Sequence, residues 1–231
     1  MPSVVVDTSI SLPATLSPGG MMRRFWVVLA LGALTYEIDH RQLELDELSR
    51  RAEREGGVIG GLNVGRERVE EARSRQAALL ELLPHGTPDS WVAIGSAPLF
   101  DEYERKLREI GQKLDPALRD KDIPLLRRQL EAVCAIGAPP FTEEAVPLLT
   151  QDRNDDGILY TALLGDADLL VSDDKHLVPD RHEHHWEYDG RSVVAVTVDT
   201  LLSERLDAAT LSDIDGSLLA SCASPRVSYG L

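Results

Sequence analysis

Four short apolar runs constrain the fold of this chain more than any other feature. They cover residues 4–6, 91–95, 167–171 and 193–198, and aliphatic side chains dominate them. A strand that is apolar on both faces is typical of the inside of a parallel sheet, where helices cover both sides. Since helical patterns separate the runs, we expect a three-layer α/β fold with a central, mainly parallel sheet.

The segments between these runs predict the helices, which cover residues 21–34, 96–114, 123–133, 143–149, 155–164 and 199–206. Residues 40–83 differ in composition, because they are rich in Arg, Glu and Leu and are interrupted by pairs of glycines. Their apolar spacing indicates two amphipathic helices, which we interpret as a helical insertion. We therefore expect one domain over residues 1–206 and a weakly ordered tail over residues 207–231.

Composition excludes several classes of protein. The net charge is −15, and residues 133–231 carry 18 acidic side chains against 6 basic ones, so an overall basic nucleic-acid surface is absent. Cys134 and Cys222 are too few for a disulfide framework or a CxxC metal pair, and they favour a reducing, cytoplasmic location. The longest apolar run, residues 25–34, is about half of a membrane span, so we expect no membrane association. The chain has no GxGxxG fingerprint and no P-loop.

Acidic residues recur where apolar segments end or helices begin. Asp7 follows the first apolar run, and Asp174 follows the third. Asp155 lies in the first turn of a helix, and Glu102 lies beside the apolar seam of another. Ligands of parallel sheets bind beyond the carboxyl ends of the strands, so we expect these acids to share one crevice.

Such a cluster predicts a cation site. Close carboxylates repel one another unless protons or a cation neutralise them. Oxygen ligands select hard cations, and Mg²⁺ combines a few carboxylates with the phosphate groups of a substrate. The pattern therefore predicts metal-assisted hydrolysis of phosphodiester bonds. Each acid taken singly is explained better as an ordinary helix-start or turn residue, and only their joint placement favours the metal site.

Three stretches of the sequence resemble the PIN-domain nucleases. They are Val4-Val5-Val6-Asp7-Thr8-Ser9, the stretch Ser96-Ala97-Pro98-Leu99-Phe100-Asp101-Glu102-Tyr103, and the longer stretch 155–177 with its Asp173-Asp174-Lys175-His176 turn. The subgroup they resemble is that of the VapC-like toxin components of toxin–antitoxin systems. The resemblance implies a ribonuclease with Mg²⁺ or Mn²⁺ bound by four acids, Asp7, Glu102, Asp155 and Asp174. It also implies that Thr8 or Ser9 orients the carboxylate of Asp7.

The chain departs from the family pattern at two positions. Asp173 stands where a glycine is usual, and His176 stands where a further aspartate is usual. Whether Asp156, Asp173 or His176 joins the metal site therefore stays open. The insertion also offers a rival middle acid, because Tyr36-Glu37-Ile38-Asp39 followed by Glu44 and Glu47 mimics the strand-then-helix motif around Glu102. We prefer Glu102.

The resemblance implies RNA as the substrate, approached by basic side chains such as those of Arg23, Arg24, Arg105 or Lys175. It also allows an antitoxin-like protein or a second copy of the chain as a partner. A competing hypothesis is a catalytically weak binding module that engages a protein partner through residues 40–83. For that segment we prefer a solvated charged surface to a partner-binding one.

A group of histidines forms a separate candidate site. His182 and His184 could share one face of a strand and bind a transition metal. We prefer to interpret residues 182–185 as a polar loop or an edge strand.

Overall fold

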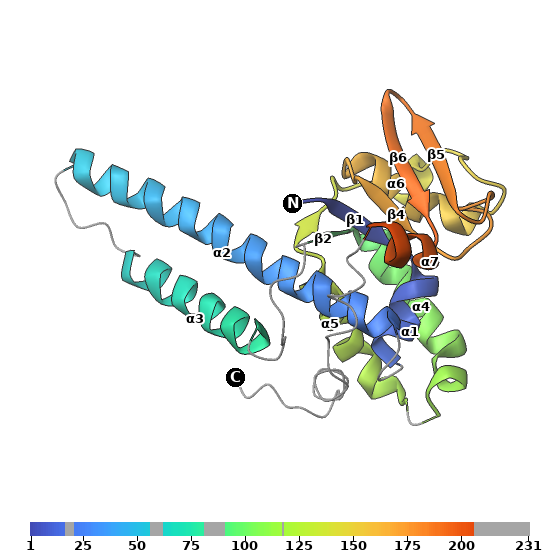
Figure 1. Ribbon diagram of the computed structural model, residues 1–231, viewed down its shortest axis with the longest axis horizontal. Helices are drawn as coiled ribbons and strands as arrows, with labels where there is room; N and C mark the ends of the chain where they lie inside the picture. Colours follow the sequence, from blue (N-terminus) through green and yellow to red (C-terminus); the bar gives the residue numbers. More distant parts are fainter. Residues whose placement is uncertain (17–20, 56–61, 81–90, 117, 206–231) are drawn as a thin grey trace.

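The computed structural model describes residues 1–16, 21–55, 62–80, 91–116 and 118–205. Its strands are β1 Ser3–Val6, β2 Val92–Gly95, β3 Ile136–Gly137, β4 Leu169–Val171, β5 Glu183–Tyr188 and β6 Arg191–Val196. They form one six-stranded sheet in the order β3-β2-β1-β4-β6-β5 (Figure 1). Every neighbouring pair is parallel except β5 and β6, which form an antiparallel hairpin. The expected α/β fold with a mainly parallel sheet is confirmed.

Helices cover both faces of this sheet. They are α1 Thr8–Leu16, α2 Met21–Glu55, α3 Leu62–Leu80, α4 Ala97–Leu114, α5 Ile123–Val133, α6 Arg153–Leu164 and α7 Val198–Thr200, with the shorter turns η1 Asp120–Asp122, η2 Glu143–Ala145 and η3 Leu201–Arg205. Val4 and Val6 of β1 lie in a core with residues of α1, α2, α4 and α5, whereas Val5 lies in a second core with residues of α6. Because successive strand side chains point to opposite faces, the three valines of β1 are buried between two helical layers.

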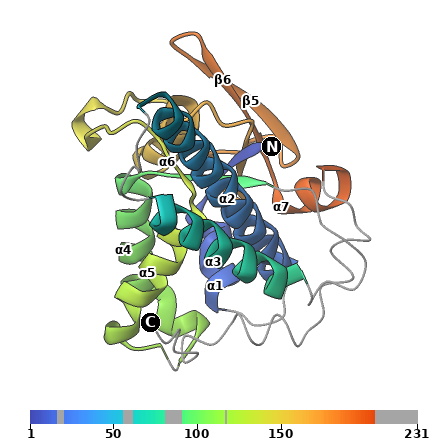
Figure 2. The same ribbon diagram turned by 90° about the vertical axis from the view of Figure 1, so that its left-hand side faces the viewer.

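The helical insertion is present, but its first helix is longer than predicted. We expected one helix to end at residue 34 and another to begin within the insertion. That expectation is wrong, because α2 continues without a break for 35 residues. Its second half lies beside α3, away from the sheet (Figure 1, Figure 2). Buried Leu45 and Val69 pack within this pair of helices, which we call the α2–α3 arm.

The first half of α2 lies directly against the sheet. A Cβ atom added at Gly32 would come within 1.8 Å of the carbonyl oxygen of Trp91, at the start of β2. Only glycine allows the helix backbone to approach the strand so closely. The apolar residues 25–31 are therefore core residues of the α/β fold. None of the helices in the described ranges has a stretch long and apolar enough to cross a membrane.

Several element boundaries also differ from the prediction. The sequence pattern does not predict the two-residue β3 or α1, which begins where the carbonyl of Asp7 accepts the amides of Ile10 and Ser11. Helix formation at 143–149 is limited to η2, and Val198 begins α7 instead of ending β6. The histidine-rich segment forms β5, so the edge-strand interpretation is confirmed. The predicted tail, residues 207–231, lies outside the described residues.

Candidate metal centre

Two neighbouring parallel strands place the first pair of acids. Val6 at the end of β1 pairs with Val171 at the end of β4. Asp7 follows directly, and its amide donates a hydrogen bond to the carbonyl of Val171 at 3.0 Å. Asp174 lies three residues beyond Val171, in the turn that leaves β4. Both acids therefore lie at the carboxyl-end edge of the sheet, as the sequence predicts.

Three hydroxyl groups hold the carboxylate of Asp7, which is 3% exposed. Ser9 Oγ and Ser172 Oγ each donate to Oδ2 at 2.6 Å, and Thr8 Oγ1 donates to Oδ1 at 3.2 Å. Thr8 and Ser9 both contact the carboxylate, as expected of residues that orient it. Sequence reasoning missed Ser172, although its place directly after β4 is a signal. Ser172 also accepts the amide of Asp174 at 2.9 Å, so it joins the two strand ends.

The first turn of α6 places two adjacent aspartates in different roles. Asp156 is completely buried, and its Oδ1 accepts the amides of Leu149 and Thr150 at 3.1 and 2.7 Å. Its Oδ2 accepts Arg153 Nη1 at 3.2 Å, so this carboxylate fixes the loop before the helix. Asp155 is 8% exposed, and its Oδ2 is buried without a hydrogen-bond partner. Such an orphaned oxygen fits a cation ligand.

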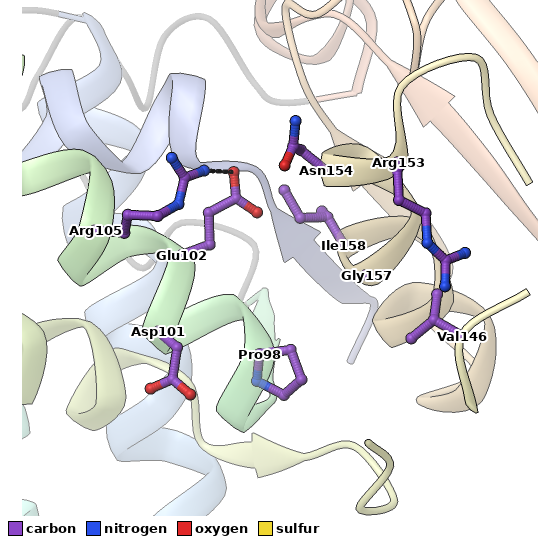
Figure 3. A pocket seen from close by; sticks show the side chains of 9 residues that line it. All are labelled: Pro98, Asp101, Glu102, Arg105, Val146, Arg153, Asn154, Gly157 and Ile158. Carbon is purple, nitrogen blue, oxygen red and sulfur yellow. Dashed lines mark ion pairs between the residues drawn. The ribbon is translucent and has the colours of Figure 1, made fainter. Parts of the chain in front are cut away.

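Glu102 lies on α4 beside a groove of about 270 Å³ (Figure 3). The groove runs between α4 and the start of α6, where Asn154 and Ile158 line it. The guanidinium of Arg105 lies 3.7 Å from the Glu102 carboxylate, whose side chain is 14% exposed. Burial, followed by the negative charge of Asp7, raises the pKa of Glu102 to about 7. Glu102 is therefore a carboxyl group that can exchange a proton near neutral pH.

The pKa of Asp155 reflects the charges of the other predicted acids. Its pKa is raised to about 7, first by burial and then by the charges of Asp174, Asp7, Asp152 and Glu102. The charges of Asp7, Glu102 and Asp174, the other three acids that the sequence singled out, therefore act on Asp155. Burial first, and then the negative charges of neighbouring acids, raises the pKa of Asp155 and of Glu102 to about 7.

Two further side chains adjoin Asp155. Ligand atoms of Asp152, Asp155 and His176 lie within 4.8 Å of one another. Asp152 was missed as a site residue, although its place just before α6 is a signal. It is the N-cap of that helix, and its pKa is lowered, mainly because it accepts the amide of Asn154. His176 was left open by the sequence, and the structure places it beside the cluster.

The remaining candidates lie elsewhere. The Glu47 side chain is 59% exposed on the α2–α3 arm and forms ion pairs with Arg50 and Arg54. Residues 36–39 belong to α2, so the expected strand before Glu47 is absent and the rival motif is wrong. Asp173 is exposed, and its carboxylate accepts the amide of Val198 at the start of α7.

The histidines near β5 have local partners. His182 Nδ1 lies 2.9 Å from Thr200 Oγ1, and His184 Nδ1 lies 3.0 Å from Asp180 Oδ2. Within the described ranges, the group of three potential ligands formed by His, Cys, Asp or Glu is the one around Asp155, and these histidines are not part of it.

The predicted basic side chains differ in their positions. Arg105 lines the groove beside Glu102, and Lys175 is exposed in the turn after β4. The side chains of Arg23 and Arg24 lie outside the described part of the structure.

Comparison with known proteins gives no further assignment. No family model matches the chain, and neither a curated protein nor a solved structure shows significant similarity to it.

Proposed function

We propose that this chain is a PIN-like, Mg²⁺- or Mn²⁺-dependent endoribonuclease and the VapC-like toxin component of a toxin–antitoxin pair. The observation that carries the proposal is that Asp7 and Asp174 follow adjacent parallel strands, while their charges and that of Glu102 on α4 act on Asp155 in the first turn of α6. The resemblance of the three sequence motifs to PIN nucleases supports it as well, because those motifs contain these four acids.

The residues present fit a divalent cation. Burial, and then repulsion by the neighbouring acids, raises the pKa of Asp155, and a charge of +2 would offset that repulsion. The buried Oδ2 of Asp155 has no other partner, while the hydroxyls around Asp7 hold its carboxylate in one orientation. Oxygen ligands of this kind are those that Mg²⁺ and Mn²⁺ prefer.

The chain's own groups have distinct roles in phosphodiester hydrolysis. A bound divalent cation would supply an activated water and neutralise charge on the phosphate. Asp7, Asp155 and Asp174 would hold it. Glu102, with a pKa of about 7, would accept a proton from the attacking water. Arg105 lines the same groove and would pair with a phosphate oxygen of the RNA.

The direct test is cleavage of mixed-sequence single-stranded RNA with Mn²⁺ in the presence and absence of EDTA. We expect cleavage that EDTA abolishes and that Asp174→Asn removes without unfolding the protein. Asp168, an acid just before β4, is unsuitable as a control position, because its carboxylate accepts hydrogen bonds from the amide and the hydroxyl of Ser3. Glu47→Gln, on the exposed arm, is the matched control and should cleave like the wild type. Cleavage that EDTA does not affect would contradict the proposal.

A second candidate function is a binding module that uses the α2–α3 arm. The observation in its favour is that the arm exposes two large apolar side chains, Leu43 at 65% and Val64 at 50%. An antitoxin-like protein or a second copy of the chain would cover them. Light scattering of the wild type and of Leu43→Ser with Val64→Ser tests the second copy. A concentration-dependent dimer that the double variant abolishes would support it, and a monomer in both would argue against it.

A further inference from the structure

Asp152, Asp155 and His176 meet where two rigid parts of the fold come together. The two aspartates belong to the N-terminal turn of α6, and His176 lies in the turn that leaves β4. The amide of His176 donates to Asp174 Oδ1 at 2.8 Å, which holds this turn in place. The three ligand atoms lie within 4.8 Å of one another. Ligands on opposite sides of an ion at about 2.1 Å are about 4.2 Å apart, so small side-chain movements are enough to bind one.

Unsatisfied polar atoms at this place point to a ligand. Only 8% of the surface of Asp155 is exposed, and its buried Oδ2 accepts no hydrogen bond. Nδ1 of His176 is also buried and has no partner. Buried polar atoms of folded proteins are nearly always satisfied, and an ion is a recognised reason for an exception. Both hydrogen bonds that Asn154 donates to Asp152 fall on Oδ1 of that carboxylate.

The donor set differs from that of the four acids. An imidazole nitrogen with two carboxylates favours Co²⁺, Ni²⁺ or Zn²⁺, whereas a set of oxygens alone suits Mg²⁺. Three protein ligands also leave coordination positions open for water or a substrate oxygen. The imidazole therefore adds a selectivity that carboxylates cannot supply.

We infer that Asp152, Asp155 and His176 form a second cation site, selective for a transition-metal ion over Mg²⁺, which shares Asp155 with the four-acid cluster. Asp155 belongs to both groups of ligands, and each of its two carboxylate oxygens could contact one ion. The inference goes beyond the proposed function, because binding at this site requires no RNA and no hydrolysis.

The test is a Co²⁺ titration of the full chain, followed by visible absorption and calorimetry. The wild type should bind Co²⁺ with an absorption band that millimolar Mg²⁺ does not displace. His176→Ala should weaken this binding at least tenfold, because removal even of groups behind the ligands weakens metal sites 10- to 100-fold. The matched control is His182→Ala with His184→Ala, which should bind Co²⁺ like the wild type. Circular dichroism without metal shows that each variant is folded.

A second variant tests whether the imidazole is the cause of the preference for Co²⁺ over Mg²⁺. His176→Asp keeps three ligands but makes them all oxygens, so Mg²⁺ should now compete with Co²⁺. A Co²⁺ absorption band that resists Mg²⁺ and survives His176→Ala, or one that the His182 and His184 double variant abolishes, would overturn the inference. The result is separate from that of the nuclease test. Co²⁺ binding that depends on His176, in a protein that does not cleave RNA, would refute the proposed function alone.

Discussion

Ser172 and Asp7 are 165 residues apart in the sequence, yet Ser172 Oγ donates a hydrogen bond of 2.6 Å to Asp7 Oδ2. The same hydroxyl accepts the amide of Asp174. One buried serine therefore sets the positions of the acids at the ends of β1 and β4. Its role is structural and electrostatic, since it fixes the carboxylate that would bind a cation.

Ser172→Ala should weaken Mn²⁺ binding by about 10- to 100-fold, as expected for a group that orients a metal ligand. It should also lower the free energy of unfolding by about 1–3 kcal/mol, because a buried charged acceptor loses a donor. Calorimetry and urea unfolding measure the two effects. Ser203→Ala is the control, because that exposed hydroxyl donates only to backbone carbonyls. Unchanged Mn²⁺ affinity in Ser172→Ala would contradict the role assigned to the serine.

The two middle acids give a paired prediction about activity. Glu102→Gln should reduce Mn²⁺-dependent RNA cleavage at least 100-fold, because general acid–base groups typically contribute factors of 10²–10⁴. Glu47→Gln should change cleavage less than twofold, since Glu47 is on the exposed arm. Single-turnover rates on one RNA compare them. A reversed order would mean that Glu47 belongs to the site.

Adjacent Asp155 and Asp156 should respond to the same substitution in opposite directions. Asp155→Asn removes a buried charge that its neighbours repel, so it should raise the Tm of the metal-free protein at pH 8. Asp156→Asn weakens bonds that fix residues 149 and 150, so it should lower the Tm. Thermal unfolding with EDTA measures both. Changes in Tm of the same sign for the two variants would show that the charge of Asp155 does not destabilise the metal-free protein.

The metal-free protein should lose stability as the pH rises from about 4 to about 7. The pKa of Asp155 is raised from 3.8 to about 7, and that of Glu102 from 4.5 to about 7. Within this window the folded state holds protons that the unfolded state has released, so the free energy of unfolding falls with increasing pH. Urea unfolding in EDTA from pH 4 to pH 8 measures the slope. The double variant Asp155→Asn with Glu102→Gln should have a flatter profile.

Divalent metal should reverse this pH trend. Mn²⁺ at about 100 times its Kd adds about 2.7 kcal/mol to the free energy of unfolding. At roughly 2–4 °C per kcal/mol, the Tm should rise by about 5–10 °C. Protons compete with the cation for the carboxylates, so the rise should be larger at pH 8 than at pH 5.5. Differential scanning calorimetry tests this. Equal rises at both pH values would argue against carboxylate ligands with raised pKa values.

Gly32→Ala tests the close approach of α2 to the sheet. Alanine stabilises an ordinary helix interior by about 1 kcal/mol relative to glycine. At Gly32, however, the new Cβ would collide with the Trp91 carbonyl at 1.8 Å, so we expect destabilisation of at least 2 kcal/mol. Gly65→Ala is the matched control, because its nearest atom is the Leu45 Cδ1 at 3.3 Å, which can move. Urea unfolding should therefore show opposite signs for the two variants.

The sequence by itself determined the layers of the fold and the acids that meet. Runs of apolar residues such as 4–6 and 169–171 have to be buried on both faces, and this requires a parallel sheet between helices. Parallel strands then bring Asp7 and Asp174 to the same edge, whatever the details of packing. The spacing and the length of apolar runs are local properties of the sequence, so the need to bury them can be read from it directly.

Only the tertiary structure decided which polar atoms are satisfied. Asp155 and Asp156 are adjacent aspartates in the same helical turn. The amides of residues 149 and 150 donate hydrogen bonds to Asp156, whereas Oδ2 of Asp155 has no hydrogen-bond partner. The length of α2 is also a tertiary result, because packing against α3 extends the helix beyond its apolar half. Distances between residues far apart in the chain depend on how helices and loops pack, and no local pattern encodes them.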